Sequence, residues 1–181
     1  MSGFFLILGC GMMGTIEMIN IGTDYKERKM AKEIKTIGIG NDHAAPEMKF
    51  EIKKYLEEKG YKVVNFGTDT SDRVNYPEYG AKVGRAVASG ELDAGVLICG
   101  TGIGISLAAN KIKGIRAAVV GDPVSARLAK EHNHANIIAF GSRIVGIETA
   151  KAIVDAWLDA EELGGRHADR VDMLMALEDE Q

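Results

Sequence analysis

The chain lacks the features that mark secreted, membrane-spanning or nucleic-acid-binding proteins. Its 181 residues include only two cysteines, Cys10 and Cys99, which are too few for a disulfide framework and favour a reducing, cytoplasmic location. No apolar run approaches the length of a transmembrane helix, and the apolar stretch GFFLILGCGMM lacks the flanking signals of a secretory leader. The formal net charge of −4, without a long basic run, gives no indication of a nucleic-acid surface. We therefore expect a cytoplasmic protein with no nucleic-acid or membrane partner.

A glycine-rich motif opens the chain, with Gly9, Gly11 and Gly14 in the spacing G-x-G-x-x-G. A dinucleotide-binding turn of this spacing needs a strand before it, a helix after it and an acidic residue about twenty positions on. After Gly14 no apolar stripe develops, and Asp24 lies in a polar turn. We interpret residues 1–35 as an N-terminal extension of uncertain role, and we expect no dinucleotide binding there.

From residue 36 onward, short apolar stretches alternate with amphipathic ones. The expected strands are TIGIGN, YKVVNFG, AGVLICG, IRAAVVG and ANIIAFG, each followed by a helical pattern. Continuously apolar strands separated by helices predict a parallel sheet with both faces covered. We predict a single α/β domain over residues 36–181: a doubly wound, Rossmann-like αβα sandwich of three layers, with a five-stranded sheet in the order 2-1-3-4-5. A charged tail helix, RVDMLMALEDE, closes this domain.

Ligands bind to such sheets at the carboxyl ends of the strands, where the strand order reverses. Two loops are expected there: NDHAAP, which carries Asp42 and His43, and CGTGIGIS, which begins with Cys99. The glycines of the second loop let the backbone approach a ligand, and the helix that follows directs amides and its positive dipole end at an anion. The positive potential at the start of this helix also favours the thiolate form of a nearby cysteine. A buried structural cysteine beside a tight turn is the alternative, but the nearby Asp42 and His43 favour a chemical role.

Three arginines flank glycines in the last quarter of the chain. Arg143 follows the last expected strand, and Arg166 and Arg170 lie four residues apart on one helical face. Near an anion-binding loop, such arginines indicate a phosphate clamp. His132 and His134 match no common zinc-ligand spacing, so we expect no metal, and we interpret His134 as a surface or packing residue.

Residues 36 to about 175 contain, in this order, the blocks NDHAAPEMK, NYPEY, LICGTGIGISLAANK, GIRAA, EHNHAN, FGSRIVG and GGRHADRV. In these blocks the chain resembles the type B ribose-5-phosphate isomerases, within the wider family that includes galactose-6-phosphate isomerase subunits. The resemblance implies isomerisation of a phosphorylated aldose to its ketose through an enediolate. It also implies that the reaction uses no metal and no organic cofactor.

By this resemblance, Cys99 is the base that moves a proton between C1 and C2 of the open-chain sugar. His132 assists ring opening as an acid, with Asp42 nearby, and the Thr101 hydroxyl and the amides of residues 100–104 hold the enediolate oxygens. The implied catalytic set is Cys99, His132, Thr101 and Asp42. The implied substrate-binding set, in which His43 and the three arginines bind the phosphate, is Asp42, His43, Tyr76, Gly100, Thr101, Gly102, Ile103, Gly104, Asn133, Arg143, Arg166 and Arg170.

Three residues depart from the pattern of the family. Ala45 and Pro46 replace a glycine and an aromatic residue that often follow the histidine, and Asn75 stands where an aspartate commonly precedes the tyrosine–proline pair. These departures leave the sugar open between ribose 5-phosphate, allose 6-phosphate and galactose 6-phosphate. A sugar-phosphate-binding module without catalysis is a further alternative, against which the presence of Cys99 and His132 argues.

The expected topology separates the site residues into two groups. Asp42, Cys99 and Arg143 follow strands and lie at the carboxyl edge of the sheet, whereas His132 and Arg170 follow helices and lie at the opposite edge. One subunit is too thick for the two groups to meet. We therefore expect a homodimer, with further association to a tetramer left open, in which Cys99 of one chain faces His132 of the other.

Overall fold

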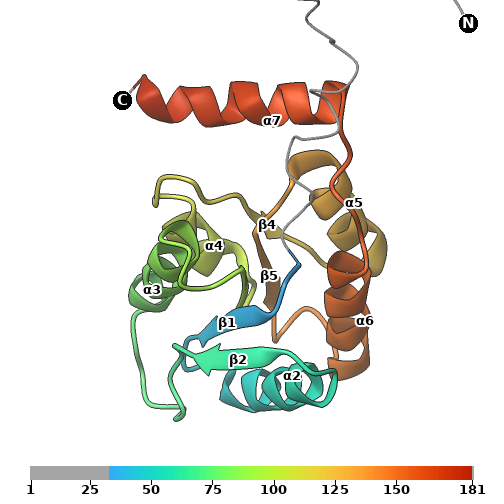
Figure 1. Cartoon of the computed structure of the whole chain (residues 1–181). Coiled ribbons are helices and arrows are strands. Elements are labelled where there is room, and N and C mark those ends of the chain that lie inside the picture. Colours follow the sequence, from blue (N-terminus) through green and yellow to red (C-terminus); the bar gives the residue numbers. More distant parts are fainter. Residues whose placement is uncertain (1–32, 181) are drawn as a thin grey trace, which may run out of the picture. The chain divides into compact units, whose positions relative to one another are not determined.

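The computed structural model describes residues 33–180, so the opening glycine motif lies outside the described part of the chain. Within it, parallel strands form one sheet (Figure 1). The strands are β1 (Thr36–Asn41), β2 (Lys62–Asn65), β3 (Ala94–Cys99), β4 (Ala117–Val119) and β5 (Ile137–Gly141), and their order is β2-β1-β3-β5-β4. The predicted α/β class and five-stranded parallel sheet are confirmed.

The predicted strand order 2-1-3-4-5 is wrong in its last two positions. β5 lies between β3 and β4, with Ile137 paired to Gly95 and Gly141 paired to Cys99. All five residues of β5 are buried, whereas β4 has three residues, none of them fully buried. A strand that is apolar on both faces belongs inside a sheet, and a short, half-exposed strand belongs at its edge. The corrected order brings the loop after β5 directly beside Cys99.

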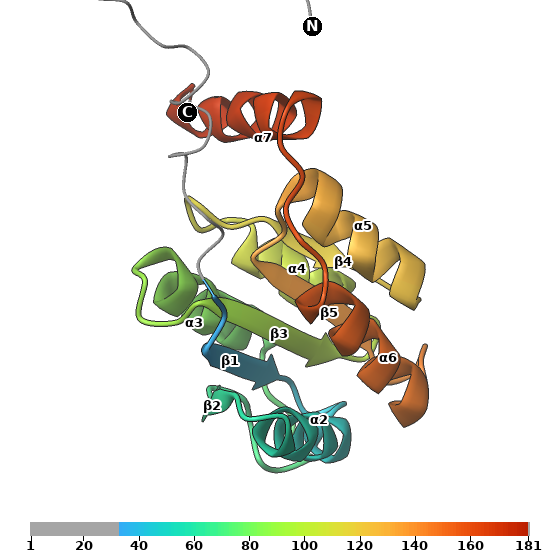
Figure 2. The same ribbon diagram turned by 45° about the vertical axis from the view of Figure 1, so that its right-hand side comes forward.

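Helices cover both faces of this sheet. They are α2 (Pro46–Glu58), α3 (Tyr76–Ala88), α4 (Ile103–Ala109), α5 (Pro123–Asn133), α6 (Ile147–Leu158) and α7 (Arg166–Ala176), and α7 continues into a short 3-10 turn, η1 (Leu177–Asp179). Figures 1 and 2 show α3 and α4 on one face and α2, α5 and α6 on the other. The alternation of strands and helices therefore gives three layers, as the sequence pattern predicts.

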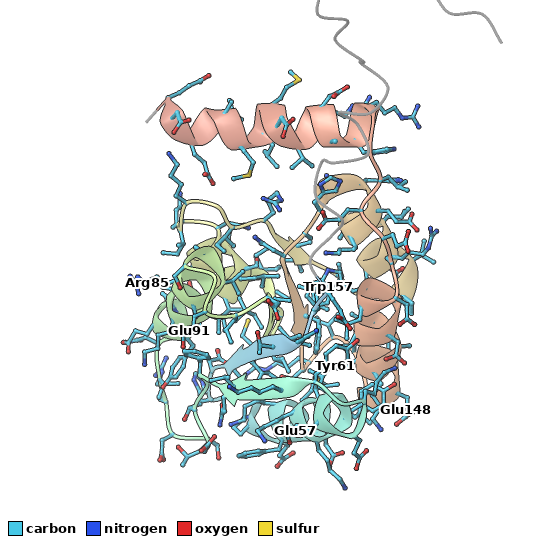
Figure 3. All side chains as sticks on the ribbon, in the orientation of Figure 1. Glu57, Tyr61, Arg85, Glu91, Glu148 and Trp157 are labelled. Carbon is cyan, nitrogen blue, oxygen red and sulfur yellow. The ribbon has the colours of Figure 1, made fainter. Side chains whose placement is uncertain are left out.

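Each face of the sheet has its own apolar core. The larger one lies against α2, α5 and α6 and contains Trp157, which is fully buried and donates from Nε1 to the carbonyl oxygen of Ala135 at 3.0 Å. Figure 3 shows Trp157 inside the molecule and the charged side chains of Glu57, Arg85 and Glu148 at its outside. The smaller core joins α3 and α4 to the opposite face. The two apolar cores hold the sheet between its two layers of helices.

α7 and η1 end the described chain, and α7 packs against α5 (Figures 1 and 2). Val171 is buried, but Met173, Leu174 and Leu177 are exposed. The expected tail helix is therefore present, with much of its apolar surface uncovered in the single chain. No helix within residues 33–180 is long and apolar enough to cross a membrane.

Candidate active site

Three loops meet at the carboxyl edge of the sheet, one after each of β1, β3 and β5. Ser142 links them, because its amide donates to the carbonyl oxygen of Cys99 at 2.8 Å and its hydroxyl donates to that of Ala44 at 2.8 Å. The amide of Arg143 donates to the carbonyl oxygen of Gly100 at 3.1 Å. The three loops thus form one hydrogen-bonded unit. Ser142 lies in the block FGSRIVG, but no local sequence pattern predicts these contacts.

Cys99 ends β3 and is 5 % exposed. The amide N–H of Gly102 donates to its Sγ at 3.1 Å. Gly102 has a φ of +81°, and a Cβ atom at this position would lie 2.8 Å from the backbone of Phe140. Only glycine fits this turn, which directs a backbone donor at the sulfur. Such a contact suits a thiolate base.

The rest of the glycine-rich loop leads into α4. The amide of Ile103 donates to the Thr101 hydroxyl at 3.3 Å, so the amides of Gly102 and Ile103, both expected to hold an enediolate, already have partners. The first amides of a helix have no intrahelical acceptor, so that of Gly104 is suited to a ligand oxygen. A Cβ atom at Gly104 would lie 2.7 Å from the ring of Tyr76, so this ring packs directly against the loop at Gly104.

Asp42 and His43 follow β1 at the same edge. Because Asn41 pairs with Ile98, Asp42 lies level with Cys99. The Asp42 side chain is buried, and its Oδ1 accepts the amide N–H of the residue two positions on at 2.9 Å. Nδ1 of His43 lies 3.2 Å from a backbone carbonyl oxygen in the loop that follows β2. The structure thus places Asp42, His43 and Cys99 at the edge of the sheet where the sequence predicts them.

A buried lysine links α2 to the loop that follows β2, next to the carboxyl edge of the sheet. Lys49 of α2 is fully buried, and its Nζ donates to the carbonyl oxygen of Thr68 at 3.0 Å and to the carboxylate of Asp69. The hydrogen bond from Lys49 lowers the pKa of Asp69. Asp69 lines a cavity of about 800 Å³ together with His43 and Arg143. Sequence reasoning missed Lys49 because a lysine in a helical pattern normally faces solvent.

A second group of predicted residues lies at the amino edge of the sheet, in the last turn of α5. His132 and Asn133 occupy this turn, and the Arg116 guanidinium donates to the carbonyl oxygens of Asn133 at 3.1 Å and His134 at 2.8 Å. A cation at these acceptors stabilises the helix end. His134 ends the helix with a φ of +49°, and its Nε2 lies 2.9 Å from the carbonyl oxygen of Leu163. His134 is therefore a packing residue here.

α7 brings Arg166 and Arg170 to the same end of the molecule. Arg170 lines a cavity of about 230 Å³ together with His132, Asn133 and His167. The imidazole rings of His132 and His167 stack, with centroids 4.2 Å apart and planes 12° from parallel. No local pattern in the sequence predicts that these two rings meet, so His167 is a site residue that the sequence alone does not reveal.

Burial and charge shape the groups around this second cavity. Burial lowers the pKa of His167, and the charges of His132 and of the two arginines of α7 lower it further. Glu162, before α7, accepts a hydrogen bond from Lys130 of α5 at 2.8 Å. Burial alone would raise the pKa of Glu162, but the hydrogen bond and charge of Lys130 outweigh burial and lower it. The cavity lining carries the Arg170 guanidinium and two imidazoles and no carboxylate, which suits a phosphate.

The two groups of residues do not meet within one chain. Cys99 is level with Gly141 at the end of β5, whereas His132 precedes Ile137 at its start. The four residue steps along β5 alone span about 13 Å, which exceeds the reach of an imidazole side chain. The two cavities share no lining residue. The residues of the candidate site therefore form two separate groups, which we name the carboxyl-edge half-site (Asp42, His43, Cys99, residues 100–104 and Arg143) and the amino-edge half-site (His132, Asn133, Arg166, His167 and Arg170).

Comparisons with known proteins place the chain in a family. Residues 37–174 match the family model described as Ribose/Galactose Isomerase. The chain is 53% identical over 145 residues to ribose-5-phosphate isomerase B of Escherichia coli, over 80% of this chain and 97% of that relative.

Two solved structures are similar along the same region. The Clostridium thermocellum ribose-5-phosphate isomerase B has a TM-score of 0.79 and 52% identity, over 80% of this chain and 98% of that one. The Mycoplasma genitalium ribose-5-phosphate isomerase B, with bound ribulose 5-phosphate, has a TM-score of 0.77 and 37% identity, over 81% and 97% of the two chains. The resemblance to the type B ribose-5-phosphate isomerases is confirmed, and the chain belongs to the ribose/galactose isomerase family.

Proposed function

We propose that the chain interconverts ribose 5-phosphate and ribulose 5-phosphate through an enediolate. The observation that carries this proposal is the hydrogen bond from the Gly102 amide to Sγ of the buried Cys99. The same short loop supplies a base and backbone donors, and proton transfer next to a carbonyl needs both. Membership of an isomerase family supports the same reaction.

Cys99 acts as the base in this proposal. Its thiolate removes the proton from C2 of the open-chain aldose, and the electron pair moves through the C1–C2 bond onto the C1 oxygen, which gives an enediolate. The Thr101 hydroxyl and the amide of Gly104 stabilise the charge as it develops on that oxygen. The thiol then returns the proton to C1, while the proton of the C2 hydroxyl moves to the C1 oxygen, which gives the ketose.

A cyclic aldose must open before its C2 proton can leave. His132 donates a proton to the ring oxygen as the anomeric hydroxyl loses its proton, with Asp42 nearby. Since the two half-sites lie at opposite edges of one chain, the acid comes from a second copy. Each complete site then combines Cys99 of one subunit with His132 of the partner subunit, in a homodimer.

Exposed apolar side chains support such a dimer. Ile103 and Leu107 of α4 are 55% and 58% exposed, and Val119 of the edge strand β4 and Leu174 of α7 are 46% exposed. A groove of about 420 Å³ runs between β4 and α7. Large apolar side chains exposed together mark a protein interaction surface. A two-fold axis at this surface turns the carboxyl edge of each subunit towards the amino edge of its partner.

The phosphate is bound from both chains in this arrangement. His43 and Arg143 come from one subunit, and Arg166 and Arg170 of the partner subunit face them. A Cβ atom at Gly100 would lie 3.4 Å from the Arg143 guanidinium, so Arg143 lies directly against the glycine-rich loop. Guanidinium groups bind phosphate oxygens in pairs, which fixes the orientation of the sugar as well as its affinity.

Ketose formation from a panel of aldose phosphates tests the proposed function. The full chain is incubated with ribose 5-phosphate, allose 6-phosphate and galactose 6-phosphate, and we expect the highest kcat/KM for ribose 5-phosphate. Ala45 and Pro46 both line the cavity that His43 and Arg143 line, so these two departures, together with Asn75, are the ones able to alter the sugar pocket. A preference for a six-carbon phosphate would revise the sugar and keep the chemistry. Binding of all three without any ketose would refute catalysis.

A further inference from the structure

His167 lies within the amino-edge half-site, and the mechanism above gives it no role. It belongs to the first turn of α7, directly after Arg166, and faces His132 at the end of α5. The two imidazole rings stack face to face, 4.2 Å apart and 12° from parallel. A ring packed at this distance limits the rotation of its neighbour, so the stack restricts His132 to one orientation.

Arg166 contacts the edge of the same ring. Its Nε–H donates to Nε2 of His167 at 3.5 Å. A guanidinium group has donors and no acceptor, so Nε2 is the unprotonated nitrogen, and the proton of the neutral ring is on Nδ1. His167 therefore contacts the proposed acid through its face and an arginine of the proposed phosphate clamp through its edge.

The surroundings of His167 disfavour the protonated form of its ring. The groups whose charge acts on it are His132 and His134 of α5 and Arg166 and Arg170 of α7, and none of these is acidic. Burial lowers the pKa of His167, and these positive groups lower it further. A neutral ring can lie against a protonated His132, whereas two cationic rings at this distance would repel each other.

We propose that His167 is a positioning residue for ring opening: it holds the His132 imidazole in the orientation that the opening of a cyclic aldose phosphate requires. The inference rests on the proposed function and adds a requirement that applies to the cyclic sugar alone. Ribulose 5-phosphate carries its phosphate on the C5 hydroxyl and so cannot close a furanose ring. Proton exchange at its C1, which needs Cys99, therefore does not need His167.

Two substitutions separate the stack from other roles of the side chain. His167→Ala removes the ring, and His167→Phe keeps a flat ring without nitrogen. Asp172→Ala, an exposed position on the same helix, serves as the matched control. In the full chain we expect His167→Ala to lower kcat/KM for ribose 5-phosphate about fivefold to tenfold, and we expect the phenylalanine variant to recover most of that loss. Exchange of the C1 proton of ribulose 5-phosphate in D2O, followed by NMR, is expected to keep its original rate in all three variants.

Two results would overturn the inference. An exchange rate that falls in His167→Ala as far as isomerisation does would place the effect at the Cys99 step, and full isomerase activity in that variant would remove the role altogether. The ring-proton NMR shifts of His132 in the ligand-free protein test the stack without activity, and they should change in the alanine variant. Unchanged shifts would contradict the stack. An original chain that neither isomerises nor exchanges either sugar would refute the proposed function, and the inference with it.

Discussion

The two half-sites are built in different ways. At the carboxyl edge, Cys99 lies in loops that continue buried strands, and the amides of Gly102 and Ser142 bond directly to its sulfur and its carbonyl oxygen. At the amino edge, His132 lies in the last turn of α5. The end of this helix is stabilised by a long side chain, because the Arg116 guanidinium donates to its last carbonyl oxygens. The proposed base thus has a backbone frame, whereas the proposed acid depends on side chains and on α7.

This difference matches the demands of the two tasks. A base must approach one carbon atom within a narrow range of distance and angle, and fixed backbone donors hold that geometry without reorganisation. A phosphate clamp works through charge and flexible guanidinium groups, which tolerate small displacements. Substitutions of the proposed base at the carboxyl edge should therefore stop proton transfer, whereas at the amino edge loss of His132 should stop ring opening and loss of an arginine should weaken phosphate binding.

The largest effect is expected for Cys99→Ala. Removing the proposed base should lower kcat for ribose 5-phosphate by about a thousandfold or more and leave substrate affinity nearly unchanged, because the loop and the phosphate contacts remain. Steady-state kinetics and calorimetric titration measure the two quantities separately. Turnover close to that of the original chain would remove the cysteine from the mechanism.

At the amino edge, Arg170→Ala should act mainly on binding. Loss of a charged hydrogen-bond donor to the phosphate is expected to raise KM for ribose 5-phosphate by roughly tenfold to a hundredfold, with a smaller effect on kcat. Arg170→Lys keeps the charge but lacks the paired donors, so its KM should fall between that of the original chain and that of Arg170→Ala. Binding of free ribose is the control, and an equal loss for the unphosphorylated sugar would point to a folding defect.

Lys49→Met should affect stability more than chemistry. The substitution leaves the Thr68 carbonyl oxygen and the Asp69 carboxylate without their buried donor, and we expect a loss of about 1–3 kcal/mol in the free energy of unfolding. Lys53→Met on the same helix is the control, because Lys53 forms a partly exposed ion pair with Glu57, for which a loss of about 0.5 kcal/mol or less is expected. Equal losses in a denaturant titration would show that burial of Lys49 does not matter.

The smallest effect concerns the pH dependence of stability. His167 has a pKa below its ordinary value of 6.5, so the unfolded chain takes up a proton at this residue before the folded chain does. The free energy of unfolding should therefore fall as the pH drops from above 6.5 through the lowered pKa, and it should fall less in His167→Phe. Denaturant titrations at about pH 7.5 and pH 5.5 measure this difference. If the free energy of unfolding fell equally in the original chain and in His167→Phe, His167 would not be the group responsible for this pH dependence.

The contrast between the half-sites also explains what the sequence could predict. The strands, the glycine-rich loop and the position of Cys99 at a strand end are local patterns, and the structure has them where expected. The predicted order of the last two strands was wrong because their order depends on a comparison of the burial of β4 with that of β5. Ser142 and His167 were missed because their contacts join distant segments: Ser142 bonds to a residue 98 positions away, and His167 stacks on a ring of another helix.

The most direct test asks whether the two half-sites of one working site belong to different chains. Inactive Cys99→Ala and His132→Ala proteins are mixed in equal amounts, dissociated reversibly and allowed to reassociate. Random pairing makes roughly half of the dimers mixed, and each mixed dimer has one intact site of two, so activity with ribose 5-phosphate should recover to roughly a quarter of that of the original protein. Mixed dimers that form and remain inactive would contradict the shared site.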